Sequence, residues 1–174
     1  ISVRVAPALV PRDHPLASVH GANNAVFVQA EAAGNLIFYG AGAGGVQTAS
    51  AVLGDVVSAA RRHIAGGVGV GESTRANLPV LPIGRVTTRY QITLDVSDEP
   101  GVLSTVAGIL AEGRVSIATA LQTVITQANG ESGTARIVIG THRALEQDLS
   151  ETVDRLAASG VVDRIVSVLR VEGD

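Results

Sequence analysis

A strand, a tight turn and a helix follow one another within residues 90–110, and this order constrains the fold more than any other stretch. Residues 91–96 alternate polar and apolar side chains, which is the period of a half-buried strand. Pro100 suits the first turn of a helix, and Ser97 or Asp98 can cap the amides beyond it. Apolar side chains then recur at helical spacing, at Val102, Leu103, Val106, Ile109 and Leu110.

The turn between these two elements is a candidate ligand site. Gly101 has no Cβ, so a ligand or another backbone can approach it closely. The free amides at a helix start favour a bound carboxylate. The same residues are also typical of a capped helix start that binds nothing, and the local pattern leaves both interpretations open.

The turn and the strand after it carry a family resemblance. The turn reads Asp98-Glu99-Pro100-Gly101-Val102-Leu103 and resembles the D-x-P-G-V-L turn of ACT domains, small regulatory modules that bind amino acids. The stretch 115–122, VSIATALQ, resembles the second strand of that family. The resemblance implies an effector site built from the turn and from a strand of a neighbouring copy, at Asp98, Glu99, Pro100, Gly101, Val102, Leu103, Ile117, Ala118 and Thr119.

The rest of the C-terminal half completes such a module. Two strands, 115–125 and 135–140, flank Asn129-Gly130, which is a strong hairpin signal. The last strand spans 161–171. We therefore predict an α+β, ferredoxin-like βαββαβ fold over 89–174, with two helices on one antiparallel sheet. The second helix has its apolar stripe at Leu145, Leu149, Val153 and Leu156.

The N-terminal third is predicted to contain strands, a hairpin and one helix. Residues 3–5 alternate like a short strand, and the prolines that follow exclude a regular helix. Residues 25–30 and 36–39 form a predicted hairpin around Gly34, and the helix is predicted over 48–64. The hairpin holds three aromatic side chains that are expected in a core, Phe27, Phe38 and Tyr39.

His14 is the one histidine in this region that invites a functional role. It stands beside Pro15 without a second histidine or a paired carboxylate at a metal-binding or catalytic spacing. A structural role is therefore expected, and no metal site is predicted anywhere in the chain.

A glycine run separates the hairpin from the helix. Gly40, Gly42 and Gly45 match G-x-G-x-x-G between a strand and a helix. A complete dinucleotide-binding unit also needs a second parallel strand that ends in an acidic residue, and the sequence offers neither. The amides of the run can still contact a phosphate or the edge of a substrate.

The same third of the chain resembles homoserine dehydrogenases. Residues 5–17 (VAPALVPRDHPLA), 21–26 (GANNAV) and 39–52 (YGAGAGGVQTASAV) match three motifs of that family in order. The resemblance implies an NAD(P)-dependent oxidoreductase that interconverts aspartate semialdehyde and homoserine. It also implies that the nucleotide-binding Rossmann domain lies upstream of Ile1, that Gly42, Ala43 and Gly44 face the nicotinamide end of the cofactor, and that no catalytic residue lies within this chain.

Three segments follow from these observations. Residues 1–64 are predicted to end a catalytic domain, 65–88 to form a Gly/Pro linker, and 89–174 to form the ACT domain. The chain has no methionine and opens on strand-like residues, so we expect it to be the C-terminal part of a longer protein and to be inactive alone. Part of 65–77 is expected to be mobile.

Composition excludes several classes of function. The net charge of −3 and the 2% aromatic content argue against binding of nucleic acid. The absence of cysteine excludes disulfides and thiolate metal sites and agrees with a cytoplasmic location. No apolar stretch is long enough for a membrane span.

Two functions remain. The first is an amino-acid sensor attached to the dehydrogenase, with threonine as the effector that the resemblance implies and with assembly through the ACT sheet. The second is a ligand-free dimerisation module, because the edge strand of such a sheet can pair with a second copy. A self-contained enzyme is excluded, since the chain holds neither a complete cofactor site nor an acid/base constellation.

Overall fold

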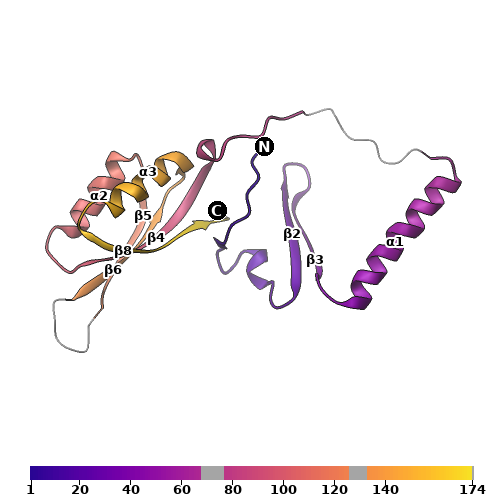
Figure 1. Ribbon diagram of the computed structural model, residues 1–174, viewed down its shortest axis with the longest axis horizontal. Coiled ribbons are helices and arrows are strands. Elements are labelled where there is room, and N and C mark those ends of the chain that lie inside the picture. Colours follow the sequence, from indigo (N-terminus) through magenta and orange to yellow (C-terminus); the bar gives the residue numbers. More distant parts are fainter. Residues whose placement is uncertain (68–76, 126–132, 174) are drawn as a thin grey trace. The chain divides into compact units, whose positions relative to one another are not determined.

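The computed structural model describes residues 1–67, 77–125 and 133–173 (Figure 1). The chain divides into two compact units, one formed by Ile1–Leu9 with Leu78–Asp174 and the other by Val10–Asn77. Among the described helices, none combines the length and the apolar character that a membrane crossing requires.

The larger unit has the predicted ferredoxin-like topology. Its sheet has the order β1-β8-β4-β6-β5, and β4, β5, β6 and β8 pair antiparallel with their neighbours. Both helices lie on one face of this sheet (Figure 1). The elements are β4 (Thr87–Ser97), α2 (Val102–Glu112), β5 (Ile117–Ile125), β6 (Thr134–Thr141), α3 (Glu146–Ala157) and β8 (Val162–Val171), with the two-residue strands β1 (Ala8–Leu9) and β7 (Ala144–Leu145).

The core of this unit lies between the sheet and the two helices. The central strand β4 is buried along most of its length because it has β8 on one side and β6 on the other. The stripe predicted for α2 is confirmed, except that Leu103 is 43% exposed. Leu149, Val153 and Leu156 of the other predicted stripe pack into the core, whereas Leu145 lies in β7 before α3 and is 44% exposed. The fully buried side chains include Ile92, Leu94, Val96, Val106, Leu110, Ile137, Ile139, Leu149 and Leu156.

The segments that connect the elements of this unit differ in part from the sequence-based expectation. β4 begins at Thr87, and a short 3-10 helix, η2 (Ile83–Arg85), precedes it, so the predicted linker includes ordered residues. Most of the segment predicted to be mobile, and the predicted turn at Asn129-Gly130, lie outside the described residues.

The smaller unit contains the predicted hairpin and helix. The 3-10 helix η1 (Pro15–Ser18) leads to β2 (Asn23–Ala30) and β3 (Gly34–Ala41), which pair antiparallel, and α1 (Gly45–Ile64) follows. The structural role of His14 is confirmed. Its Nδ1 accepts a hydrogen bond from the Leu16 amide at 3.2 Å, and its ring meets the Phe27 ring edge-on at 4.7 Å.

Several details of this region were predicted wrongly. Phe38 and Tyr39 are 63% and 58% exposed, because the described part of this unit has only two strands and places no element over these side chains. α1 begins at Gly45, and its N-cap is Gly44, without a side-chain cap from Thr48 or Ser50. Residues 3–5 are not a strand; β1 lies further on in the chain.

α1 is an amphipathic helix without a covered face. All of its 20 residues are exposed, although the helix carries an apolar stripe. An isolated helix of this length gains little stability from propensity alone, so its apolar face needs a partner surface. The stripe includes Val46, Leu53, Val57 and Ile64.

Candidate functional site

The predicted effector turn connects β4 to α2 through backbone contacts. The Asp98 amide donates to the Gly133 carbonyl at 3.0 Å, which ties the turn to the start of β6. The Glu99 carbonyl accepts a hydrogen bond from the Val102 amide at 3.4 Å. The N-cap is Gly101, with φ of +94° and no side-chain cap. Capping by a polar side chain was therefore predicted wrongly, and Pro100 precedes the helix instead of opening it.

The start of α2 leaves two amides available. The first bond of the helical pattern runs from the Thr105 amide to the Gly101 carbonyl at 2.9 Å. Helix geometry therefore gives the amides of Leu103 and Ser104 no acceptor within the helix. A Cβ built at Gly101 would meet nothing within 4 Å, so the approach to these amides is open. Their dipoles place partial positive charge at this end of the helix.

The strand half of the predicted site lies at the start of β5. Ile117 is half-buried against the core, whereas Ala118 and Thr119 are exposed. The pairing with β6 shifts register between Ile117 and Thr119, so Ala118 stands in a bulge. The Thr119 side chain packs over Gly140, where a Cβ would approach its hydroxyl to 2.5 Å.

Within one chain the two halves lie at opposite ends of the sheet. Ser97, at the end of β4, pairs with Thr134 of β6, whereas Ile117 pairs with Thr141. Seven residues of strand separate these levels, about 23 Å. A single copy therefore does not bring the turn and the strand half together.

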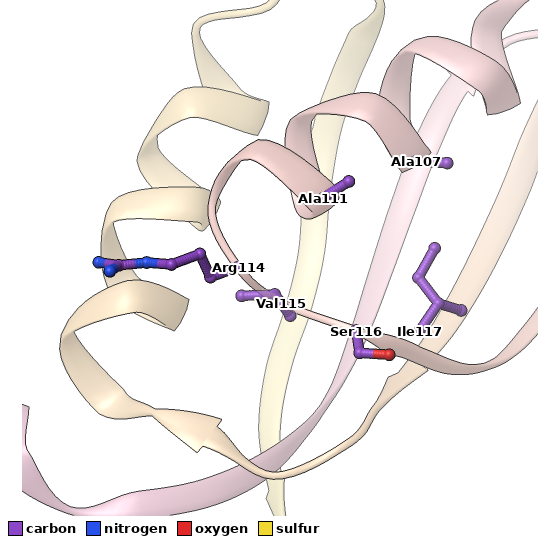
Figure 2. Close-up of a pocket in the computed structure, with 6 residues that line it drawn as sticks. All are labelled: Ala107, Ala111, Arg114, Val115, Ser116 and Ile117. Atoms are coloured by element: carbon purple, nitrogen blue, oxygen red, sulfur yellow. The ribbon is translucent and has the colours of Figure 1, made fainter.

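A cavity of about 440 Å³ lies at the C-terminal end of α2. Ile117 is the only residue of the predicted site that lines it. Figure 2 shows Arg114 extending toward α3, where it pairs with Asp148 at 3.1 Å, away from Ile117. Sequence reasoning missed the rest of the lining, although two alanines spaced by four on one helix were an available signal. The lining residues are Ala107, Ala111, Arg114, Val115, Ser116 and Ile117.

The predicted cofactor residues Gly42, Ala43 and Gly44 connect β3 to α1. All three are exposed, and the Gly42 amide donates to the Ala22 carbonyl at 3.1 Å. Gly44 has φ of +131°, a conformation that favours glycine. A Cβ on Gly42 would collide with the Asn24 side chain at 1.5 Å, so the chain itself fills that side of the run. The run can offer backbone contacts to one edge of a dinucleotide and holds no charged group for its phosphates.

A charged cluster occupies β4 two residues before its end. Asp95 is 6% exposed and accepts hydrogen bonds from Arg136 at 2.8 and 3.1 Å and from Arg164 at 2.8 Å. The hydrogen bonds from Arg136, and to a lesser extent the one from Arg164, lower the pKa of the Asp95 carboxyl against the opposing effect of burial. The two ion pairs of Asp95 join β4 to β6 and to β8, so the role of this cluster is structural.

Comparison with known families gives two matches along the chain. Residues 1–57 match the family model "Homoserine dehydrogenase", and residues 90–161 match the ACT domain model. The homoserine dehydrogenase of Mycobacterium tuberculosis is 54% identical over 173 residues, 99% of this chain and 39% of that protein. That of Corynebacterium glutamicum is 52% identical over 174 residues, 100% of this chain and 38% of that protein.

A solved structure shows the same arrangement of elements. The crystal structure of a homoserine dehydrogenase from Thiobacillus denitrificans superposes with a TM-score of 0.84 at 33% identity, over 98% of this chain and 39% of that chain. The chain thus spans about 39% of the length of the relatives that it matches. It carries part of a homoserine dehydrogenase domain in residues 1–57 and an ACT domain in residues 90–161.

Proposed function

We propose that this chain is the regulatory part of an NAD(P)-dependent homoserine dehydrogenase, a cytoplasmic enzyme that interconverts aspartate semialdehyde and homoserine. In this proposal the ACT domain binds an amino-acid effector, threonine, and reports it to the enzyme. The observation that carries the proposal is the open helix start beside Gly101 in a domain whose edge strand β5 is free to pair.

A second copy of the chain would complete the effector site. β5 is an edge strand, and residues 118–124 are all exposed, including Leu121 at 65% and Val124 at 53%. Such an edge pairs readily with another strand. β5 ends at Ile125, level with Ser97, since both pair with Thr134. Antiparallel pairing of two β5 strands therefore brings the turn of one copy to the same end as Ile117 of the other.

The chemistry of the turn suits a zwitterion. The amides of Leu103 and Ser104 are placed to donate to a carboxylate at the positive end of α2. Asp98 is exposed beside them and can accept hydrogen bonds from an ammonium group. Leu103 and Ile117 would limit the size of the effector side chain. Threonine is the effector that the family resemblance implies.

The cofactor would bind mainly outside this chain. NAD(P), when bound, supplies the group that accepts or donates hydride. Backbone groups of Gly42, Ala43 and Gly44 would contact its nicotinamide end, and the rest of the dinucleotide site would come from a Rossmann domain elsewhere in the protein. The uncovered apolar stripe of α1 is suited to pack on that remainder.

A ligand-free dimerisation module is the second candidate, because the exposed edge of β5 accounts for assembly without an effector. The two candidates differ in whether a free amino acid stabilises the ACT domain. In the dimerisation module the turn at Gly101 would have only a structural role.

A melting series with the twenty amino acids tests the proposal. Threonine at a hundred times its Kd should stabilise the fold by about 2.7 kcal/mol. For a domain of this size the melting temperature should rise on the order of ten degrees. Asp98→Ala should weaken binding by about 1.5–3 kcal/mol, the range for a hydrogen bond to a charged group. If no amino acid shifts the melting temperature of the wild type, the sensor is excluded and the dimerisation module remains.

A further inference from the structure

The first nine residues are built into the unit that holds the ACT domain. β1 pairs in parallel with the end of β8, with Ala8 opposite Arg170 and Leu9 opposite Val171. The Glu172 amide donates to the Leu9 carbonyl at 2.8 Å. At the other end of the segment, the Leu81 amide donates to the Ile1 carbonyl at 2.8 Å. Figure 1 shows this indigo segment reaching the end of β8.

Arg4 fastens the middle of this segment to two side chains of the ACT domain. Its guanidinium lies 2.8 Å from Glu146 Oε1 and donates to the Tyr90 hydroxyl at 3.1 Å. The Tyr90 hydroxyl in turn donates to Glu146 Oε1 at 2.5 Å. Burial, and then the hydrogen bond to Glu146, raises the pKa of Tyr90, which keeps the phenol protonated as a donor. We call these three residues the Arg4 clasp.

Because Glu146 and Tyr90 are buried, the clasp depends on the positive charge of Arg4. Glu146 and Tyr90 are 8% and 7% exposed, and the Arg4 side chain is 26% exposed. Glu146 Oε2 is buried and accepts no hydrogen bond from the described residues, and Arg4 forms an ion pair with Oε1 of the same carboxylate. Removing one partner of a buried ion pair strongly destabilises the fold around it, because the remaining charge is left buried without compensation. Loss of Arg4 should therefore loosen the segment.

The clasp is connected to the effector turn by packed helices. Glu146 is the first residue of α3, and α2 starts at the turn. α2 and α3 meet where Gly113 faces Thr152, so closely that a Cβ on Gly113 would lie 2.0 Å from the threonine hydroxyl. Beside the clasp, a cavity of about 140 Å³ between α3 and strands β4 and β8 leaves room for a small shift of α3.

The segment held by the clasp leads directly into the other unit. The chain passes from Leu9 into Val10–Asn77 and returns at Leu78, and residues 1–57 are those that match homoserine dehydrogenases. We propose that Glu146 and Tyr90 form the docking site for Arg4, and that this clasp transmits the effector state of the ACT domain to the dehydrogenase part. The transmission rests on the proposed function, whereas the docking itself does not.

The test uses the full-length dehydrogenase that contains this chain, with Arg4→Ala and Arg4→Lys. Arg155→Ala is the matched control, because it removes an arginine from an exposed ion pair with Glu112 between the same two helices. Hydrogen exchange is followed at the amides of Leu81 and Glu172. Arg4→Ala should speed both by at least about tenfold, and Arg155→Ala should leave them unchanged. Arg4→Lys keeps the charge but cannot span both acceptors, so its exchange rates should lie between those of the wild type and of Arg4→Ala.

The same variants are assayed for threonine binding and inhibition. In Arg4→Ala, threonine should still bind with a Kd within about threefold of wild type, while the activity that remains at saturating threonine rises at least fivefold. Unchanged exchange in Arg4→Ala would overturn the docking. Faster exchange with wild-type inhibition would overturn the transmission. If the wild type is inhibited by no amino acid, the proposed function and the transmission both fail, and the exchange measurement still decides the docking.

Discussion

At the scale of single residues, the effector turn depends on one glycine in a left-handed conformation. Gly101 has φ of +94° and open space around its missing Cβ. The sequence indicated Gly101 as a point of close approach, and the structure adds a backbone reason for the same residue. The predicted caps failed because the Glu99 carbonyl and the Gly101 backbone form the turn without a side chain.

Gly101 and Gly108 should respond in opposite ways to the same substitution. Gly101→Ala should lower the free energy of unfolding by about 1–2 kcal/mol, because an L residue resists positive φ. Gly108→Ala, in the middle of α2 with open space around its Cβ position, should raise it by about 0.5–1 kcal/mol. Urea denaturation of both variants measures the two changes in the free energy of unfolding. A neutral Gly101→Ala would show that the turn does not hold this conformation in solution.

Asp95 should make the ACT domain sensitive to acid. Its native pKa is lowered by Arg136, so its contribution to stability is complete above its ordinary pKa of 3.8 and is lost as the pH falls through the lower native value. Asp95→Asn should therefore lower the melting temperature at neutral pH, and the gap to wild type should close below about pH 3.8. Melting curves between pH 7 and 2 measure this, and a gap that is constant over the whole range would refute it.

At the scale of elements, the parts with strong periodicity were predictable. β4, α2 and α3 were predicted because apolar residues recur with the period of two or of 3.6, and each element buries that face. β1 was missed because a two-residue parallel strand has no period and depends on Arg170 and Val171, far along the chain. The cavity beside Ile117 was missed because the spacing of Ala107 and Ala111 indicates a helix face of small side chains without showing that open space lies beside it.

In the proposed dimer, assembly depends on β5. Leu121 lies in the middle of this strand and is 65% exposed, so Leu121→Lys should place a charge in the expected pairing without disturbing the core. The variant should be monomeric in light scattering at concentrations where the wild type is dimeric, since like charges directly opposite each other repel. Leu145→Lys, at an exposed leucine outside β5, is the control that should remain dimeric. A monomeric wild type would contradict the pairing itself.

At the scale of the whole molecule, the two compact units do not follow one another along the chain, because the unit that holds the ACT domain also includes the first nine residues. Residues 1–9 belong with the ACT domain in space although they match the dehydrogenase model in sequence. The exposed apolar side chains of α1 and of the hairpin, such as Val57 and Phe38, explain why core positions there could not be predicted. A sequence pattern shows that a face is apolar without showing what covers it.

The central claim is that each effector site of the dimer is formed by both copies, with the turn from one and the start of β5 from the other. Asp98→Ala damages the turn, and Thr119→Arg blocks the exposed start of β5. Each variant alone should bind threonine at least about tenfold more weakly. In a mixture refolded at equal amounts, half of the dimers should be mixed, and each should hold one undamaged site.

Calorimetric titration of that mixture with threonine is the most direct measurement. The account predicts wild-type affinity at about a quarter of the wild-type number of sites, because half of the dimers carry one intact site of two. A mixture that binds no better than the two variants measured separately would contradict it, since a site contained in one chain cannot be repaired by mixing.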